Sequence, residues 1–337
     1  MTAACAVDAR QSAVLATGRQ RLLAALKPLV AGAPSVCLLD FPAHPNVGDS
    51  AIWLGALGAL RSLGAPAPAY TCDAENYDRA AMARAIGAGT IFFTGGGSFG
   101  DLYEKHMRLR ERVVLDFPDN AIVQLPESVC FQRSESLARC RDVFNAHGRV
   151  TLMARDERSL ATFRTEFSAP SLLAPDLAFM LGALQRTSAP IRDILWLKRQ
   201  DVEDRWRGQV VAETVDWMQE PQTRLIRLSK HVRQTADNSP ARRMLDRRIQ
   251  SLLYPHLARQ RLARGLALLS TAKVVVTDRL HAHLLALLLG IPHVVLDNSY
   301  GKLHHFIAAW THESPLVHLA TDPVMAQDTA RVLLEST

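Results

Sequence analysis

The sequence has few cysteines, no internal repeats on the scale of a solenoid and no low-complexity tract. Its five cysteines are scattered over 337 residues, and no two of them form a C-x-x-C pair. This spacing excludes a disulfide framework and gives no sign of a zinc site. We therefore expect reduced, mostly buried thiols in a cytosolic protein.

The sequence also lacks an uninterrupted apolar run long enough to span a membrane. The longest candidate, residues 280–297, is broken by histidines, Gly290 and Pro292,. Residues 9–30 mix four basic side chains among leucines, which predicts an amphipathic helix rather than a secretory signal,. We expect a cytoplasmic protein, and peripheral contact with the inner face of the cytoplasmic membrane stays open.

Acidic residues are scarce in one window. The chain has a net charge of +6, and residues 224–264 contain eleven lysines and arginines against two aspartates. Such a segment suits an anionic lipid surface or a phosphorylated substrate, or it is simply a solvated helix face. Nucleic acid is not expected as a partner, because Tyr254 is the one aromatic residue in this window available for stacking,.

Short apolar runs alternate with helical patterns, which is typical of βαβ units and parallel sheets. The predicted strands are 35–41, 90–95, 121–126 and 150–155 in the first half, and 193–199, 223–230, 272–278 and 292–297 in the second. The polar segment 182–192 separates the two series. We predict an α/β protein of two Rossmann-like domains, residues 1–185 and 186–337, with the active-site cleft between them. The final helix, within 322–337, is a candidate to pack back on the N-terminal domain.

Residues 94–101, T-G-G-G-S-F-G-D, contain a G-x-G-x-x-G pattern. A dinucleotide fingerprint is expected at the first strand–helix turn of its domain, with an acidic residue about 20 positions later. This pattern lies about 90 residues into the chain, and Asp101 would repel a pyrophosphate. We instead predict a tight loop whose backbone a substrate can approach closely.

Polar residues follow several predicted strands, where α/β sheets bind their ligands. Asn46 and Asp49 follow the first strand and also suit a turn and helix cap, Glu127 follows the strand at 121–126, and Arg155 ends the strand at 150–155. A strand-end arginine can bind a phosphate or carboxylate, or pair with a neighbouring aspartate.

The stretch T-D-R-L-H-A-H, residues 277–283, follows the most apolar predicted strand of the second half. Arg279 and His281 fall at the first turn of the next helix, where a guanidinium, the helix dipole and a titratable imidazole favour an anion. His283 is two residues further on and faces away from His281 on a helix, so the pair does not predict a zinc site and His283 is expected to be structural.

Taken in order, N-V-G-D, T-G-G-G-S-F-G-D, A-R-D-E-R-S, P-D, T-D-R-L-H-A-H and D-N-S-Y-G-K resemble the bacterial polysaccharide pyruvyl transferases, in particular exopolysaccharide ketal pyruvyltransferases, over roughly residues 35–310. The resemblance implies domains in the style of GT-B glycosyltransferases. It implies phosphoenolpyruvate as donor and two sugar hydroxyls as acceptor, on a lipid-diphosphate-linked oligosaccharide. The sequence shows no metal-ligand cluster and this chemistry does not demand one, so we expect no further cofactor or metal.

On this resemblance we assign candidate roles. The donor-binding candidates are Arg155, Arg279, His281 and Lys302, with Lys198 in reserve. The catalytic candidates are His281 as general acid, Arg279, and Asp49 as one of three candidate bases. The acceptor-binding candidates are Asn46, Gly96, Gly97, Ser98, Asp101 and Glu127. Two alternatives stay open: a glycosyltransferase that uses a nucleotide sugar, and a non-catalytic protein that organises polysaccharide assembly at the membrane through residues 231–262.

Overall fold

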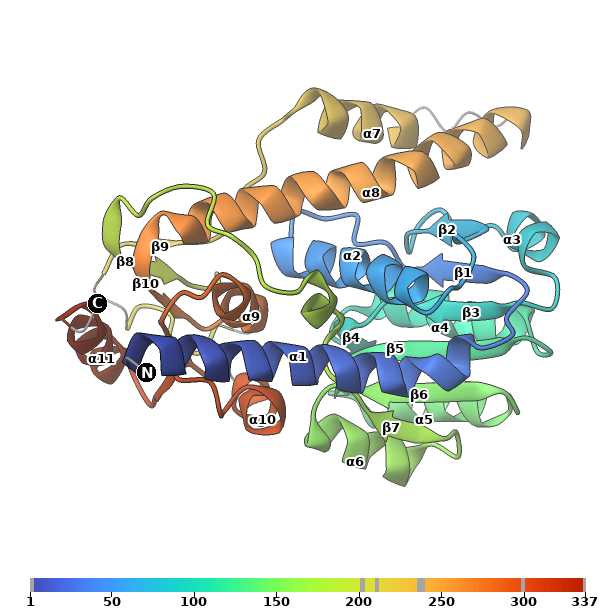
Figure 1. The fold of residues 1–337 in the computed structure, drawn as a ribbon. Helices are drawn as coiled ribbons and strands as arrows, with labels where there is room; N and C mark the ends of the chain where they lie inside the picture. The colour runs from blue at the N-terminus through green and yellow to red at the C-terminus, as the bar shows by residue number, and fades with distance from the viewer. Residues whose placement is uncertain (1–2, 201–203, 210–211, 235–239, 298–300, 336–337) are drawn as a thin grey trace.

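The computed structural model describes residues 3–200, 204–209, 212–234, 240–297 and 301–335. Two parallel β-sheets lie side by side, each flanked by helices (Figure 1). This confirms the predicted α/β architecture of two Rossmann-like units.

The first sheet has the strand order β2-β1-β3-β5-β6-β7, and β4 pairs with the far end of β5. Its strands are β1 (Val36–Leu39), β2 (Tyr70–Cys72), β3 (Thr90–Phe93), β4 (Gly96–Gly100), β5 (Ala121–Cys130), β6 (Val150–Ala154) and β7 (Ser171–Leu173). The helices that follow them are α2 (Val47–Ser62), α3 (Arg79–Ile86), α4 (Glu104–Asp116), α5 (Ser134–Asn145), α6 (Glu157–Glu166) and the short 3-10 helix η1 (Leu177–Leu181).

The second sheet has the order β12-β11-β10-β8-β9. Its strands are β8 (Arg192–Leu197), β9 (Thr214–Val215), β10 (Ala272–Thr277), β11 (His293–Leu296) and β12 (Val317–Ala320). Its helices are α7 (Arg224–Gln234), α8 (Pro240–Ser270), α9 (Leu280–Leu288), α10 (Lys302–Trp310) and α11 (Pro323–Glu335).

The two sheets share one topology. In each, the first strand lies between the second and the third, so the direction of winding reverses between β1 and β3 and again between β8 and β10. A parallel sheet leaves a crevice at such a point, just beyond the carboxyl ends of the strands, and that crevice is where α/β proteins bind ligands. The fold therefore places two ligand-binding edges in one molecule.

Two long helices join the two halves. Helix α1 (Ala3–Val30) packs Val14 and Leu15 into the core beside the second sheet, and Leu22 and Leu26 into the core beside the first. Helix α8 also packs on both halves, but its earlier residues Tyr254 and Leu257 lie in the core beside the first sheet and its later residues Leu262 and Leu269 in the core beside the second. It packs closely along α2. Figure 1 shows α8 above the two sheets and below α7, and α1 crossing the front of the molecule.

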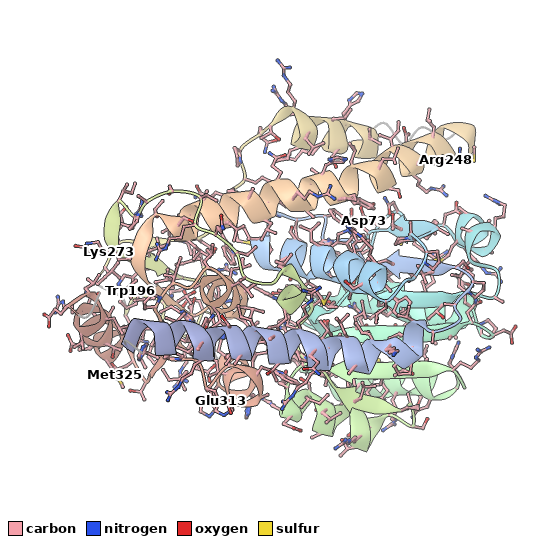
Figure 2. The ribbon with its side chains drawn as sticks, in the orientation of Figure 1. Asp73, Trp196, Arg248, Lys273, Glu313 and Met325 are labelled. Atoms are coloured by element: carbon pink, nitrogen blue, oxygen red, sulfur yellow. The ribbon has the colours of Figure 1, made fainter. Side chains whose placement is uncertain are left out.

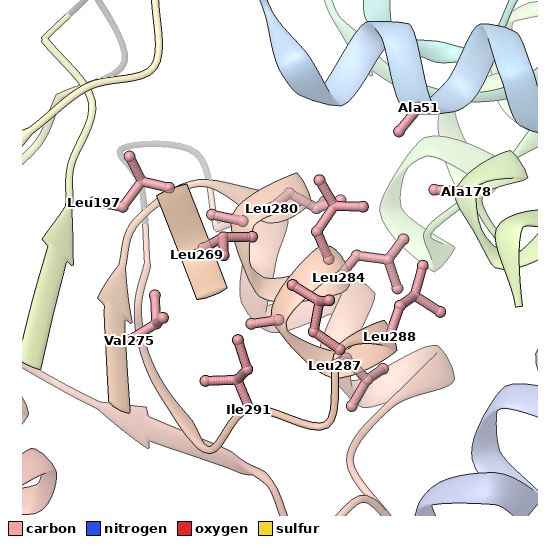
Figure 3. Close-up of a cluster of buried hydrophobic side chains, with 14 of the residues drawn as sticks. Ala51, Ala178, Leu197, Leu269, Val275, Leu280, Leu284, Leu287, Leu288 and Ile291 are labelled. Carbon is pink, nitrogen blue, oxygen red and sulfur yellow. The ribbon is translucent and has the colours of Figure 1, made fainter. Parts of the chain in front are cut away.

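Helix α9 is buried along its whole length, because leucines and alanines occupy nearly all of its positions. It packs against α2 and η1, so one apolar cluster is shared between the halves. Figure 3 shows Leu284 and Leu288 of α9 on the side of that helix that faces Ala51 of α2 and Ala178 of η1. This packing fixes the end of α9 that carries Arg279 and His281.

Two predictions about the second half were wrong. Residues 223–230 form part of helix α7 rather than a strand, because Ile226 and Val232 are buried on one side while Arg227 and Lys230 are exposed. The final helix, α11, packs on β10, β11 and β12 rather than on the N-terminal domain. The returning contact is made instead by α8, whose Tyr254 and Leu257 lie in the core of the first half.

Candidate active site

A cavity of about 270 Å³ opens between the carboxyl ends of the two sheets. Its N-terminal wall comes from the segments after β1 and β3 and from α4, and its C-terminal wall from the segments after β8 and β10 and from Trp217. Both reversal points of the fold therefore contribute to one cavity.

Arg279 lies at the N-terminal end of α9 on the C-terminal wall. The residue is 4% exposed, and its Nη2 donates to Asp216 Oδ2 at 2.6 Å. The backbone N–H of Arg279 donates to Thr277 Oγ1, which fixes the turn between β10 and α9. The guanidinium is thus held by a carboxylate at the edge of the cavity, where it can also bind an anionic ligand.

The carboxyl of Asp278 lies beside Arg279 and accepts a hydrogen bond from the backbone N–H of Arg199 at 2.7 Å. Burial raises its pKa to about 6, although the Arg199 N–H and the nearby cations Lys198 and Arg199 oppose the shift. The second sheet therefore ends in an acid that titrates closer to neutral pH than an ordinary aspartate.

His281 joins the two halves of the molecule. Its Nε2 lies 3.3 Å from Asp176 Oδ2, and the same oxygen accepts from Arg155 Nη1 at 2.8 Å. Asp176 Oδ1 caps η1 by accepting from the N–H of Ala178. Burial alone would raise the pKa of Asp176, but His281, Arg155 and the cap bond outweigh it and lower that pKa. Asp176 is therefore a carboxylate that contacts one side chain from each domain, Arg155 and His281.

Helix α2 begins directly against His281. Asn46 caps the helix by accepting from the N–H of Gly48, and a Cβ added at Gly48 would lie 2.4 Å from the His281 ring. Asn46 Nδ2 also donates to Asp49 Oδ2 at 2.8 Å, and His44 Nε2 lies 3.5 Å from that oxygen. All of these residues except Gly48 line the cavity. The N-V-G-D motif thus forms the N-terminus of α2, and it needs glycine at position 48 because a larger residue would collide with the His281 ring.

The glycine-rich segment forms part of the N-terminal wall, but it is not a simple loop. Gly96–Gly100 is strand β4, and Gly97 and Ser98 line the cavity. Gly96 has φ +139, and a Cβ there would lie 3.4 Å from Ile52 Cδ1, 3.7 Å from Glu127 Oε2 and 3.8 Å from Asp49 Oδ1. The prediction that a ligand can approach this backbone closely is compatible with that geometry.

Gly96 and the two predicted acceptor carboxylates, Glu127 and Asp101, are not part of the cavity lining. Glu127 is fully buried and accepts hydrogen bonds from the N–H and Oγ of Ser98, so it supports β4 from behind. Burial raises its pKa, against the charges of Arg110 and Arg155. Asp101 accepts from the N–H groups of Gln132 and Arg133, both at 2.8 Å, and so fixes a turn after β5. Both carboxylates were predicted as ligand-binding groups because they follow strands, and both instead accept hydrogen bonds from neighbouring backbone or side-chain groups of the protein.

A second carboxylate–histidine pair, Asp40 and His106, was not predicted from the sequence. Asp40 follows β1, is 2% exposed, and is the one non-glycine residue with positive φ in the described chain, at 68°. Its Oδ1 lies 2.6 Å from His106 Nδ1, and its Oδ2 lies 3.1 Å from Nη1 of the fully buried Arg110. Burial would raise the pKa of Asp40, but His106 and Arg110 lower it. Asp40 and His106 both line the cavity.

Two further candidates, Lys198 and His283, do not line the cavity, and the side chain of Lys302 lies outside the described residues. Lys198 is paired with Asp204. Lys302 begins helix α10. His283 is fully buried and hydrogen-bonds His293 and Thr311, which agrees with its expected structural role. Within the described ranges, no group of three or more His, Cys, Asp or Glu side chains is arranged to hold a metal ion.

The basic segment is largely helix α8, which supports the cavity from outside. Arg261 Nη1 donates to the carbonyl of Pro42, and Arg264 Nη2 to that of Pro45, on either side of the cavity residue His44. Nearer the start of α8, Arg247 pairs with Asp78, and Tyr254 reaches Asp73. In Figure 2 the labelled Arg248 lies on α8 and the labelled Asp73 lies below that helix, where α8 packs on β2 at the edge of the first sheet. No helix among the described residues is long and apolar enough to cross a bilayer.

The fold and the cavity define a class: a two-domain α/β protein whose ligand site lies between two sheet ends and is rich in arginine and histidine. Comparison with known proteins makes that class specific. The model of the family "Polysaccharide pyruvyl transferase" matches residues 46–300, and the chain belongs to this family. It is therefore an enzyme, a polysaccharide pyruvyltransferase.

Individual relatives agree with this assignment. The chain is 33% identical to Pyruvyl transferase 1 of Schizosaccharomyces pombe, over 85% of this chain and 72% of that protein. It is 28% identical to EpsO of Bacillus subtilis, provisionally named a pyruvyl transferase, over 88% of this chain and 92% of that one. A crystal structure of a functionally uncharacterised protein from Klebsiella pneumoniae has the same fold, with a TM-score of 0.59 at 17% identity, covering 90% of this chain and 98% of that one.

Proposed function

We propose that this enzyme takes pyruvate from phosphoenolpyruvate and attaches it to two hydroxyls of one sugar residue, forming a ketal on a lipid-diphosphate-linked repeat unit of an exopolysaccharide. The observation that carries the proposal is the convergence of Arg155, Arg279 and His281 on one cavity between the sheets. Family membership selects pyruvyl transfer over the nucleotide-sugar and assembly-protein alternatives.

The donor carries a carboxylate and a phosphate, so its site needs more than one cation. Arg155 and Arg279 line the cavity, and each is held by a buried aspartate that fixes the direction of its remaining donors. Trp217 also lines it, and within the described part of the chain its buried indole N–H has no hydrogen-bond partner. We assign these three donors to phosphoenolpyruvate binding, with a contribution from Lys302.

The chemistry is a pair of additions at C2 of the donor. His281 delivers a proton to the methylene carbon C3, and the electron pair of the double bond forms the new C–H bond, which leaves C2 electrophilic. One sugar hydroxyl adds to C2 and loses its proton to a base. The C2–O bond to phosphate then breaks, and phosphate departs with the electron pair and takes up the first hydroxyl's proton from the base. The second hydroxyl adds to C2, closes the ring and returns its proton to His281. A positioned imidazole suits the first step because its ordinary pKa lies near neutral pH.

Whereas Arg279 lies on the C-terminal wall, the acceptor belongs on the part of the N-terminal wall formed after β1 and β3. Asn46, Asp49, Gly97 and Ser98 line it and offer amide, carboxylate and hydroxyl groups to a sugar. Gly96 contributes close backbone approach, and Glu127 and Asp101 hold this wall in shape. The reaction as written transfers protons and one carbon skeleton, so we propose that it uses no cofactor or metal, and that dialysis against a chelator leaves the rate unchanged.

The direct test is incubation with phosphoenolpyruvate and candidate glycan acceptors. The expected result is release of inorganic phosphate together with an acceptor mass gain equal to pyruvic acid less water. Thermal shift with phosphoenolpyruvate and with a panel of nucleotide sugars tests the donor separately, because a ligand stabilises the state that binds it. Stabilisation by a nucleotide sugar alone contradicts the proposal.

Substitution of Arg279 tests the anion site. We expect Arg279→Ala to weaken phosphoenolpyruvate binding by about tenfold or more, since hydrogen bonds to charged groups contribute roughly 1.5–3 kcal/mol. Arg331→Ala, at an exposed position on α11, is the matched control. Unchanged donor affinity in the Arg279 variant contradicts the assignment.

We also propose that the outer face of α8 contacts an anionic membrane surface. Leu245, Arg248, Leu252, His256 and Arg259 recur every three or four residues along this helix, and all are exposed. Leu252 is 72% exposed. A helix face that combines leucines with basic side chains suits the boundary between lipid headgroups and acyl chains. This contact would bring a lipid-linked acceptor to a helix that supports the cavity.

Sedimentation with vesicles tests the membrane proposal. Binding is expected with phosphatidylglycerol-containing vesicles and not with pure phosphatidylcholine, and Leu252→Ser with Arg248→Glu should reduce it. Leu115→Ser, at a leucine of α4 that is 64% exposed, controls for the loss of an exposed apolar side chain. Equal binding by the double variant and the wild type contradicts the proposal.

A further inference from the structure

The pair formed by Asp40 and His106 has the arrangement of a general base and its orienting carboxylate. His106 projects from α4 and lines the cavity, and its Nδ1 lies 2.6 Å from Asp40 Oδ1. Within the described chain, the hydrogen bonding of this ring is at Nδ1. A histidine held at Nδ1 by a carboxylate presents Nε2 as the proton-accepting atom.

Asp40 is held so that it cannot turn away. Its other oxygen faces the guanidinium of Arg110, which is fully buried and also donates to Gln124 Oε1 at 2.7 Å and to Ser98 Oγ at 3.0 Å. The backbone of Asp40 has a positive φ of 68°. The next residue ties it to strand β2, because the N–H of Phe41 donates to the carbonyl of Cys72. Unusual backbone conformations that persist in a folded protein cluster at functional sites.

The other carboxylates of the N-terminal wall are less suited to this task. Glu127 and Asp101 do not line the cavity and serve as hydrogen-bond acceptors for Ser98 and for a turn. Asp49 lines it, and its Oδ2 accepts from Asn46. An imidazole matches proton removal at neutral pH better than a carboxylate does, because the efficiency of a general base is greatest when its pKa lies near the working pH.

We propose that His106 is the general base for the attacking sugar hydroxyl and that Asp40 positions it. This inference rests on the proposed function. As the hydroxyl oxygen forms its bond to C2 of the donor, its proton moves to His106 Nε2, and the ionised Asp40 stabilises the resulting imidazolium. The proton then leaves with the departing phosphate. His281 acts as acid and His106 as base, from opposite walls of one cavity.

The pH–rate profile separates the two roles. A base must be unprotonated, so His106 gives the limb on which activity falls with acid, whereas His281 as acid gives the limb on which activity falls with alkali. The charged and titratable groups that face His106 are Asp40 beyond β1, His44 in the next loop, and Lys105 and Arg110 on α4, with Asp49 behind His44.

The test compares wild type, His106→Asn and His106→Gln, assayed by phosphate release and product mass in the full-length enzyme. Asparagine keeps a donor at the position of Nδ1 and so preserves the contact with Asp40, while it removes Nε2. We expect kcat to fall by about 10²–10⁴-fold, the KM for phosphoenolpyruvate to change little, and the acidic limb to disappear. Asp40→Asn should lower kcat less and move that limb. His304→Gln, at an exposed position on α10, is the matched control.

The outcomes distinguish this inference from the function on which it rests. Absence of transfer from phosphoenolpyruvate by the wild type overturns the proposed function and this inference together. Transfer by the wild type, with His106→Asn correctly folded and its rate and acidic limb unchanged, overturns the role of His106 alone. Thermal unfolding of each variant shows whether the fold is retained. If only His106→Gln keeps the fold, its rate and its acidic limb decide the role of His106.

Discussion

The two walls of the cavity each contain a histidine beside a carboxylate, but the two pairs are built differently. Asp40 and His106 both come from the first domain and lie 2.6 Å apart. Asp176 comes from the first domain and His281 from the second, and they lie 3.3 Å apart with Arg155 on the same oxygen. The N-terminal pair is therefore complete within one domain, whereas the C-terminal pair exists only where the domains meet. The contact of His281 with its carboxylate depends on domain packing, and the contact of His106 with Asp40 does not.

Removal of the interdomain histidine should have the largest effect on turnover. We expect His281→Gln to lower kcat by about 10²–10⁴-fold, which is the usual range for a general acid. Steady-state phosphate release measures this. His283→Gln is unsuitable as a control because His283 is part of the buried core, so the exposed His304→Gln serves instead. Normal turnover by His281→Gln would show that this imidazole does not act in the reaction.

Displacement of the same histidine should have the next largest effect. A Cβ at Gly48 would lie 2.4 Å from the His281 ring, so Gly48→Ala must push the ring off Asp176. We expect a fall in kcat of about tenfold to a hundredfold, since a misplacement near 1 Å can cost about a hundredfold. Gly58→Ala on the same helix is a matched control, because its nearest neighbour would be Met180 Cβ at 3.8 Å. Equal rates in the two variants would mean that the position of His281 is not critical.

The carboxylates at the two sheet ends should respond oppositely to pH. The pKa of Asp278 is raised to about 6, so its contribution to folding is present below pH 4 and is lost as pH rises to about 6,. Asp278→Asn should therefore gain stability relative to the wild type across that window, by at most about 1.4 kcal/mol per unit of pKa shift.

Asp40 should show the reverse behaviour. Its pKa is lowered, so its contribution is present above the ordinary aspartate range and is lost on further acidification,. Asp40→Asn should thus lose stability at neutral pH and approach the wild type in acid. Thermal unfolding of both variants from about pH 2 to about pH 7 is the measurement, because the change expected at Asp40 falls below the ordinary aspartate pKa of about 3.9,. A constant difference between variant and wild type at all pH values would contradict either assignment.

The smallest effect is expected from Glu127. This residue is buried behind β4, and glutamine retains the acceptor for Ser98 while removing a charge whose burial raises its pKa. We expect Glu127→Gln to change kcat by less than about tenfold. A loss comparable to that of the His106 variants would place Glu127 among the reacting groups and weaken the contrast between the walls.

The sequence predicted the parts of this molecule that are encoded locally. Alternating apolar and helical segments predicted two parallel sheets, and residues after strands predicted the cavity positions of Asn46, Asp49, Arg155, Arg279 and His281. The error at 223–230 arose because R-L-I-R-L-S-K fits a short strand as well as one helical face, and only burial against α8 decides between them. Propensity over so short a segment is a weak guide.

The Asp40–His106 pair was not predictable in this way. The two residues are 66 positions apart in the sequence. Asp40 lies directly before the apolar Phe41, and His106 lies in a strongly charged helix that carries no recognisable motif. Their meeting depends on β1 and β3 being neighbours in the sheet. Asp101 and Glu127 show the opposite failure, because a strand-end carboxylate looks the same in sequence whether it faces a ligand or caps a turn.

Helices α1 and α8 have a consequence for how this enzyme can be divided. Gln11 near one end of α1 hydrogen-bonds Leu287 and Ser314, while Leu26 near the other end lies in the core of the first half. Tyr254 and Leu257 of α8 fill that same core from the opposite direction. Each half thus borrows a helix encoded within the other. Fragments made by cutting near residue 186 would expose the apolar surfaces that α1 and α8 cover in the other half. Chimeras between relatives would have to exchange both helices together with the sheet that they cover.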